Sequence, residues 1–380
     1  MIDFTLSEEQ QALREKARQF AREVIAPAAM EFDAHPAFPA EIIQKAHKAG
    51  LMKLTIPKEY GGQGLGLVNA SLVTEELNVA CSGIAGMVGI SSIGCGPVLL
   101  GGTEEQKRAF LIPFNEAGLT SAFALTEREA GSDAGSIKTS AVRQGDSYVL
   151  NGTKCFITNG SFASFYSLFA TIDPTKGTKG ICAFYVPREL PGVSTGKIDD
   201  KMGQRALNTA EVIFENVVVP RDHLLGREGE GFRLAMTALD EGRVNIATVS
   251  VGIARAALEA AIDYAKKRVQ FGRPIGMNQA IQFMLADMAA AVEGARLLTW
   301  YAGSLADRGM RFSREAAQAK FVAGDTAVRV TTDAVQIHGG YGYIRDYGIE
   351  KLMRDAKLTQ IYEGTNQINR MVAGGTLVRG

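Results

Sequence analysis

The chain has 380 residues, a length that predicts two or three domains. Its 41 basic and 41 acidic residues give a net charge of zero, which argues against nucleic acid or an anionic membrane as a partner, because binding either requires a basic face. The four cysteines and four histidines are scattered without the spacing of metal ligands, so we expect neither a metal site nor a disulfide framework.

Residues 1–119 are predicted to form a helical domain. Ser7 and Thr103 each begin a capping box, and Pro39 and Gly50 predict the start and the end of a further helix. Residues 80–102 carry no charge but are rich in glycine and serine, which predicts a helix buried against a cavity and no integral membrane segment. The first residues lack the basic and apolar regions of a signal peptide, so we expect a cytoplasmic protein.

Residues 120–225 are predicted to form a β domain. Five short runs are rich in β-branched and aromatic residues, namely residues 147–152, 155–160, 165–172, 180–187 and 211–220. The spacings between these runs are short and show no helical periodicity, which favours an antiparallel sandwich or barrel over βαβ units.

Residues 226–380 are predicted to form a helical bundle. Long helices over residues 232–268, 278–307 and 313–338, joined by short loops, are typical of an antiparallel four-helix bundle. The expected fold is therefore α+β and multidomain, with the order helical, β, helical. The Gly-rich fingerprints of the Rossmann and P-loop folds are absent, so those modes of nucleotide binding have no support.

Two segments near the start of the β part are suited to ligand binding. Residues 123–136 contain small residues that let backbone N–H groups approach ligand oxygens, and the hydroxyls of Thr126 and Ser132 can donate to them. On residue types alone a plain capped loop is the favoured alternative. Phe156 beside Thr158 could flank a planar ring, although a core aromatic is the simpler interpretation.

The segment Ile361-Tyr362-Glu363-Gly364-Thr365 places a carboxylate between apolar residues and a glycine. If Glu363 faces an apolar cavity, desolvation raises its pKa, and a carboxylate tuned in this way can take a proton from a carbon acid. An exposed glutamate before a helix capped by Thr365 is the favoured alternative when the segment is taken alone.

Two further segments near helix ends have two interpretations each. Arg268 at the end of a helix either complements the helix dipole or binds a phosphate. The Gly-rich residues 336–342 form either a helix C-cap or a place where the backbone meets a ligand.

Taken together, in this order and at these distances, the motifs resemble those of the acyl-CoA dehydrogenases over nearly the whole chain. The resemblance is strongest to the short- and medium-chain members, including those that act on branched short acyl groups. It implies non-covalently bound FAD, oxidation of an acyl-CoA thioester to its trans-2-enoyl-CoA, an electron-transfer flavoprotein as electron acceptor, and a homotetramer that shares its FAD sites between subunits.

The resemblance also implies a role for individual residues. Glu363 matches the catalytic base. The residues that match the substrate-binding positions are Ser132, Asp240, Arg243, Tyr362 and Gly364. The residues that match the cofactor-binding positions are Phe123, Leu125, Thr126, Ser132, Phe156, Ile157, Thr158, Arg268, Phe271, Gln279, Gln336, Ile337, Gly339, Gly340, Thr365, Asn366 and Gln367.

This chain departs from the usual family pattern in two places. Arg128 stands where the family usually has proline, and Phe156 stands where it usually has tryptophan. Some members place the base at the position of Gly242, which cannot serve as one. The small residues Ala85, Gly86 and Gly89 match the region that lines the acyl tail in relatives, so we expect a pocket that is not closed at a very short chain.

Three functions remain open on these grounds. The first is the dehydrogenase, and the second is an acyl-CoA oxidase that reacts directly with oxygen, although such relatives are usually much longer. The third is a non-enzymatic helical scaffold, which predicts a colourless protein where the first two predict a yellow one.

Overall fold

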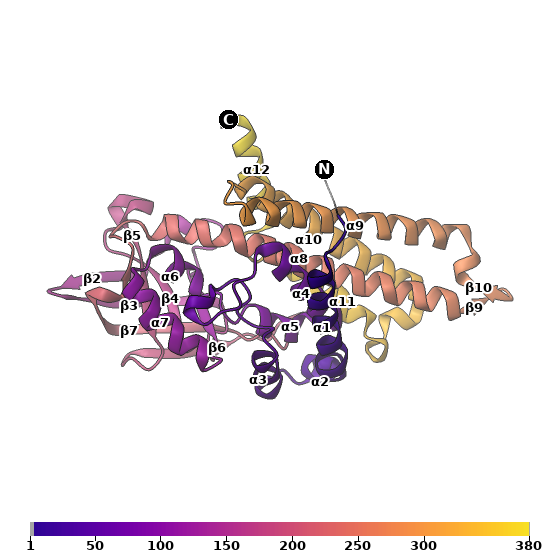
Figure 1. Cartoon of the computed structure of the whole chain (residues 1–380), viewed down its shortest axis with the longest axis horizontal. Coiled ribbons are helices and arrows are strands. Elements are labelled where there is room, and N and C mark those ends of the chain that lie inside the picture. The colour runs from indigo at the N-terminus through magenta and orange to yellow at the C-terminus, as the bar shows by residue number, and fades with distance from the viewer. Residues whose placement is uncertain (1–3, 380) are drawn as a thin grey trace.

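The computed structural model describes residues 4–379 and has an elongated shape (Figure 1). The β-sheet lies at one end, a small hairpin lies at the opposite end, and the long helix α8 runs between them. Helices α6 and α7 lie beside the sheet, most of the other helices pack along α8, and α12 projects from the body.

The N-terminal part is helical, as predicted. Its helices are α1 (Glu8–Phe20), α2 (Ala29–Ala34), α3 (Ala40–Lys48), α4 (Leu67–Ala80), α5 (Ser82–Gly89), α6 (Cys95–Gly101) and α7 (Glu104–Glu116). The capping boxes at Ser7 and Thr103 are confirmed, because each side chain accepts from the backbone N–H three residues later and the glutamine there reaches back. Helix α3 begins directly after Pro39, and Gly50 just beyond its end has a φ of +65°.

The prediction of one buried helix over residues 80–102 is wrong. Cys81 adopts an extended conformation, with φ −166° and ψ 112°, which separates α4 from α5. Residues 91–94 then form turns before α6. The glycines that lower helix propensity here also permit close packing, since a Cβ on Gly94 would lie 2.6 Å from the carbonyl oxygen of Ala122.

The middle part forms an eight-stranded sheet. The strands are β1 (Ser121–Ala124), β2 (Ser140–Gln144), β3 (Ser147–Thr158), β4 (Phe165–Thr171), β5 (Ile181–Pro187), β6 (Val193–Ile198), β7 (Thr209–Pro220) and β8 (Leu224–Leu225). Their order is β6-β7-β3-β2-β4-β5-β8, with β1 beside β4. Strand β4 is buried throughout, because alternate side chains such as Tyr166 and Phe169 enter two different hydrophobic clusters.

Two details of the predicted β domain need correction. The pairings are mostly antiparallel, but β1 and β2 both run parallel to β4. The runs predicted at residues 147–152 and 155–160 are one strand, β3, whose pairing with β7 shifts register twice instead of turning. Bulges absorb extra residues without ending a strand, so turn-forming residues such as Asn151 and Gly152 indicated a break that does not exist.

The C-terminal part is helical, as predicted. Its helices are α8 (Gly231–Lys267), α9 (Gln279–Asp307), α10 (Ser313–His338), α11 (Ile349–Leu358) and α12 (Asn366–Arg379), and the hairpin between α8 and α9 consists of β9 (Val269–Gln270) and β10 (Arg273–Pro274). By length and composition α8 could cross a membrane, but 67% of its most apolar stretch is buried inside the structure. That burial is typical of a core helix.

A buried charge network joins the first helix to the bundle. The carboxylates of Glu75 and Glu76 on α4 meet Arg18 from α1, Arg255 from α8 and Arg296 from α9 at distances between 2.7 and 3.0 Å. Burial alone would raise the pKa of Glu76, but hydrogen bonds and charge from Arg255 and Arg18 outweigh it and hold that pKa below its ordinary value. The contribution of Glu76 to stability is therefore present at neutral pH and is lost as the pH falls through its lowered pKa.

We expect Glu76→Gln to destabilise the fold by roughly 3 kcal/mol, because it removes one of the two buried carboxylates that balance the guanidinium groups of Arg18, Arg255 and Arg296. Glu259→Gln is the matched control, since Glu259 also pairs with Arg255 but its side chain is 56% exposed. Urea denaturation at pH 7 should show a clear drop in midpoint for Glu76→Gln and almost none for Glu259→Gln. Equal midpoints for the two variants would contradict the network's role.

Candidate active site

The segment predicted to carry the base is a tight loop between α11 and α12, residues 360–366, which we call the base loop. It is closed by a backbone hydrogen bond of 2.9 Å from the N–H of Asn366 to the carbonyl of Gln360. Inside it, Glu363 and Gly364 have φ values of +55° and +83°. A positive φ is rare for a residue with a side chain and is often found at functional sites, where the surrounding structure enforces it.

The carboxylate of Glu363 points at α8. A Cβ built on Gly242 would lie 2.8 Å from Glu363 Oε2, so only a glycine leaves room there. Oε2 is buried and has no hydrogen-bond partner among the described residues. Burial raises the pKa of Glu363, while the positive charges of Arg243 and Lys320 oppose that rise. The geometry therefore holds a buried carboxylate whose Oε2 is unpartnered and whose basicity is increased.

Helix α10 forms hydrogen bonds to both the beginning and the end of the base loop. Asp325 accepts hydrogen bonds from Gln360 at 2.7 Å and from Asn366 at 2.8 Å, and it pairs with Arg370 at 2.5 Å. Lys320 donates to the carbonyl of Gly364 at 2.7 Å and to Asn366 Oδ1 at 3.0 Å. The residues before and after Glu363 are thus fixed to one rigid helix.

Tyr362 ties the base loop to the other two parts of the chain. Its hydroxyl accepts a hydrogen bond of 3.3 Å from Gln204, which lies between β6 and β7. Gln204 also donates to the backbone carbonyl of Asp355 at 3.1 Å, and the Asp355 carboxylate accepts from Ser82 on α5 at 3.0 Å and pairs with Lys351 at 2.5 Å. One buried node therefore connects the N-terminal helices, the sheet and the bundle directly behind Glu363.

The predicted substrate residues Asp240 and Arg243 lie on α8 beside this loop and pair with each other at 2.5 Å. Asp240 also accepts a hydrogen bond of 2.5 Å from Ser313. Arg243 is 5% exposed, and its Nε is buried without a partner among the described residues. An unpartnered guanidinium N–H and an unpartnered carboxylate oxygen therefore come from neighbouring segments.

The first group of predicted cofactor residues lies where β1 and β3 meet. The backbone N–H of Cys155 donates to the carbonyl of Thr126 at 3.0 Å. Lys154, which is fully buried, donates to the carbonyl of Leu125 at 2.9 Å and to Glu127 at 2.8 Å. These bonds fix the loop after β1 against β3, with Leu125 buried and Thr126 half-buried.

The other members of this group differ in exposure. Phe156 is 66% exposed and has a φ of +57°, so its ring stands out from β3, while Ile157 beside it is buried. Thr158 and Phe123 are half-buried, and Ser132 is exposed. The prediction of a ring-lining aromatic at Phe156 thus falls on an accessible side chain and not on a core residue.

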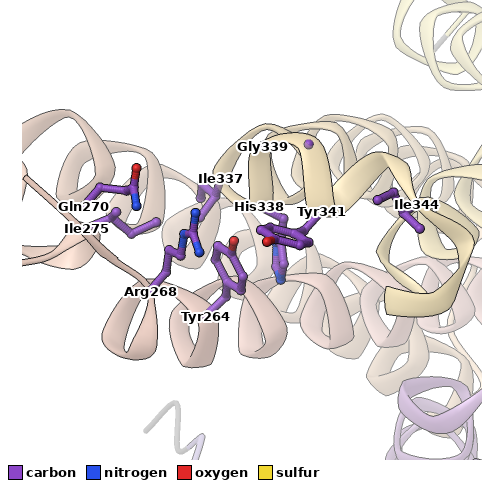
Figure 2. A pocket seen from close by; sticks show the side chains of 10 residues that line it. Tyr264, Arg268, Gln270, Ile275, Ile337, His338, Gly339, Tyr341 and Ile344 are labelled. Carbon is purple, nitrogen blue, oxygen red and sulfur yellow. The ribbon is translucent and has the colours of Figure 1, made fainter.

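The second group of predicted cofactor residues lies at the far end of the bundle. Arg268, Ile337, Gly339 and Gly340 line a cavity of about 460 Å³. Figure 2 shows Tyr264 and Arg268 reaching from α8 toward the end of α10, where the Tyr264 and His338 rings stack with centroids 4.2 Å apart. Further members of this group are exposed around the hairpin and helix ends, namely Phe271, Gln279 and Gln336.

The two groups cannot meet within one chain, because the sheet and the β9–β10 hairpin lie at opposite ends of the molecule (Figure 1). Each is nonetheless suited to part of FAD. The first offers an exposed aromatic ring and hydroxyls for a ring system. The second offers Arg268 for a phosphate, and the backbone there is open, since a Cβ on Gly339 or Gly340 would meet nothing within 4 Å.

The predicted cofactor residues after the base differ in their surroundings. The side chain of Asn366 is buried and is hydrogen-bonded to Lys320, Asp325 and the carbonyl of Phe321. Thr365 accepts from the N–H of Ile368 as a helix cap, and Gln367 is exposed.

Most of the glycines of α5 permit close packing against neighbouring residues and do not leave open space for an acyl tail. A Cβ on Gly83 or Gly86 would lie 3.2 Å from Ala206 or 3.1 Å from Leu207. Gly89 alone among the glycines of α5 has nothing within 4 Å.

Several residues that shape the site could not be identified from sequence motifs. Lys320 and Asp325 lie about 40 positions before the base loop, Gln204 lies in a different part of the chain, and Lys154 lies inside a strand. Lys320 does leave one signal. It occupies the apolar stripe of α10 together with Ala316, Ala319 and Ala323, where a charge has to have a specific partner.

Comparison with known proteins bears on this arrangement. Three family models match the chain: the N-terminal domain of acyl-CoA dehydrogenase over residues 7–117, the middle domain over residues 122–217 and the C-terminal domain over residues 229–377. The chain is 42% identical to a short-chain specific acyl-CoA dehydrogenase of Clostridium acetobutylicum, with 100% of both chains covered.

Two solved structures are equally similar in fold. Butyryl-CoA dehydrogenase from Megasphaera elsdenii matches with a TM-score of 0.97 and 43% identity over the whole of both chains. A chain from a structure whose subject is the electron transferring flavoprotein of Acidaminococcus fermentans matches with a TM-score of 0.97 and 47% identity, again over the whole of both chains. The chain therefore belongs to the acyl-CoA dehydrogenase family of FAD-dependent oxidoreductases, which oxidise acyl-CoA thioesters.

Proposed function

We propose that this enzyme oxidises short-chain acyl-CoA thioesters to trans-2-enoyl-CoA with Glu363 as the base that removes the α-proton. The observation that supports this role most strongly is the buried, unpartnered Oε2 of Glu363 facing the space left by Gly242. No other carboxylate on the base loop competes for the role, because Glu363 is the only acidic residue between 356 and 380.

The chemistry requires a strong base, since the α-C–H of a thioester is a weak acid. Burial raises the pKa of Glu363, so the carboxylate binds a proton more tightly than an exposed one does. The positive charges of Arg243 and Lys320 oppose this rise and so favour the ionised carboxylate. When bound, FAD supplies a hydride acceptor for the β-carbon, so that loss of a proton and a hydride leaves the double bond.

The remaining site assignments are also proposals. We assign cofactor contacts to the accessible group around Phe156 and Thr126 and to the group around Arg268 and Gly340, and substrate contacts to Arg243 and Tyr362. The opposite positions of the two cofactor groups support an assembly in which a second copy completes each FAD site, and we propose a homotetramer.

The acyl group is proposed to be short. The similar proteins named above act, by their names, on short-chain and butyryl thioesters. The packing of Leu207 over Gly86 narrows the region expected to line the acyl tail, while the open space at Gly89 leaves room for some extension. We therefore expect activity beyond four carbons that declines with length.

The electron acceptor is proposed to be an electron-transfer flavoprotein. The 47% identical chain from the structure devoted to such a flavoprotein supports this choice over direct reaction with oxygen. The four cysteines are all buried and unpaired with one another, which supports the proposed cytoplasmic location, a reducing compartment. We also propose that the domains divide near residues 119/120 and 225/226.

Removing the base should abolish chemistry without loss of the cofactor. We expect Glu363→Gln to retain FAD and to slow anaerobic bleaching of the flavin by acyl-CoA at least about a hundredfold, the usual contribution of a general base. Glu241→Gln is the control, because Glu241 is an acidic residue directly beside Gly242. Rapid bleaching in Glu363→Gln would show that the base lies elsewhere.

Displacing the base should have a related effect. In Gly242→Ala the added methyl group contacts the end of a flexible side chain, so the fold should persist while the carboxylate moves. We expect bleaching to slow by about a hundredfold, as for a misplacement of roughly 1 Å. Gly294→Ala on α9 is the matched control, because a Cβ there meets nothing within 4 Å. Unchanged rates in Gly242→Ala would argue against this contact.

A series of straight-chain acyl-CoAs of increasing length tests the substrate and the acceptor together. We expect the purified protein to be yellow, to be bleached anaerobically most readily by short acyl groups, and to reoxidise slowly when air is admitted. Activity confined to four carbons would contradict the open space assigned to Gly89. Reoxidation by air within one turnover time would favour an oxidase.

A further inference from the structure

Lys320 is a buried lysine that directly supports the base loop. It is fully buried on α10, and its ammonium donates to the carbonyl of Gly364 at 2.7 Å and to Asn366 Oδ1 at 3.0 Å. The Gly364 carbonyl also accepts from Asn369 at 2.8 Å. Within residues 4–379, Lys320 makes no ion pair with any carboxylate. A buried ammonium held only by neutral oxygens needs a further explanation.

The ionisable groups around Lys320 come from three elements. Glu363 lies on the base loop, Arg243 lies on α8, and Asp325 lies on α10 itself. Asp325 is already neutralised by Arg370 at 2.5 Å. Burial lowers the pKa of Lys320 to about 7, and the charge of Glu363 is the main effect that opposes this. Lys320 therefore carries its positive charge in the acid range.

We propose that Lys320 is a positioning residue for Glu363: it locks the strained turn through the Gly364 carbonyl, and its positive charge keeps the carboxylate ionised. The inference rests on the proposed role of Glu363 as the base. Lys320 touches neither substrate nor cofactor in this account. It acts on the reaction only through the conformation and the proton affinity of Glu363.

A second buried lysine shows what a purely structural role looks like. Lys53 is 2% exposed and donates to the carbonyls of Phe114 at 2.9 Å and Asn115 at 3.2 Å, at the end of α7. Burial lowers its pKa to about 8, and no carboxylate is among the groups that shift this pKa. Lys53 thus matches Lys320 in burial and in carbonyl contacts but has no carboxylate nearby, which makes it the control.

The expected effect has a definite sign. A nearby positive charge favours the ionised carboxylate, so removing it raises the pKa of Glu363. At a given acid pH less of the base is then ionised, and the rate of proton removal falls. The acid limb of the rate profile should therefore move to higher pH, by about one pH unit, the lower end of the range for a nearby opposite charge.

The test measures anaerobic bleaching of the FAD-loaded enzyme at saturating acyl-CoA across pH 5 to 9, so that the limb belongs to the enzyme–substrate complex. Lys320→Gln keeps a hydrogen-bond donor and loses the charge, and we expect its acid limb to move up by about one unit. Lys320→Arg keeps the charge, so the flavin should be bleached more slowly while the acid limb of the rate profile stays at the same pH. Lys53→Gln should be less stable with an unchanged limb.

An unmoved limb in FAD-loaded Lys320→Gln overturns the proposal and leaves Lys320 as a structural residue like Lys53. If Lys320→Gln loses FAD, the Lys320→Arg variant decides. A shift of its acid limb to higher pH, although the charge is retained, also overturns the proposal. A wild-type enzyme that no acyl-CoA bleaches means instead that the proposed function has failed. A wild-type enzyme that bleaches while Glu363→Gln also bleaches points to another base.

Discussion

The proposed role of Glu363 as the base creates a conflict at one buried carboxylate, which would have to be basic enough to take a proton from a carbon acid and still be ionised. Burial without a partner on Oε2 provides the basicity, and it also favours the protonated form. The positive charges of Arg243 and Lys320 oppose that tendency from two different helices. The positive φ values of Glu363 and Gly364 define the turn that carries the carboxylate. The absence of a side chain at Gly242 leaves room for the carboxylate against α8.

The three parts of the chain meet behind this carboxylate. Helix α5 contributes Ser82, the loop before β7 contributes Gln204, and α11 contributes Asp355, and together they fix Tyr362. A rigid support of this kind suits a base, because a general base has to lie within hydrogen-bond reach of the proton it removes. The proposed cofactor contacts are divided differently, since the two groups lie at opposite ends of the chain, and we propose that a second copy brings them together.

The sequence predicted the helical parts well because their signals are local. The capping boxes at Ser7 and Thr103 involve residues three apart, so no tertiary information is needed to recognise them. Strand β3 was divided in error because Asn151 and Gly152 are turn residues, and whether they turn or bulge depends on the partner strand β7. The uncharged run was joined in error because only the extended conformation of Cys81 separates α4 from α5.

The same distinction applies to the site. Glu363 was recognisable as an unusual carboxylate, but its burial depends on α8 and α10, which are distant in sequence. The side chain of Asn366, in the segment proposed to meet FAD, is hydrogen-bonded to Asp325 and Lys320, and no local pattern indicates these contacts. Residues that act through another residue therefore become visible only when the fold brings them together.

The most direct test of this account is a crystal structure of the FAD-loaded protein with an acyl-CoA analogue that cannot be oxidised. We expect a Glu363 carboxylate oxygen about 3 to 3.5 Å from the α-carbon, the distance of a reactive contact, on the side opposite FAD. A Glu363 side chain turned into solvent, or another carboxylate at the α-carbon, would contradict it.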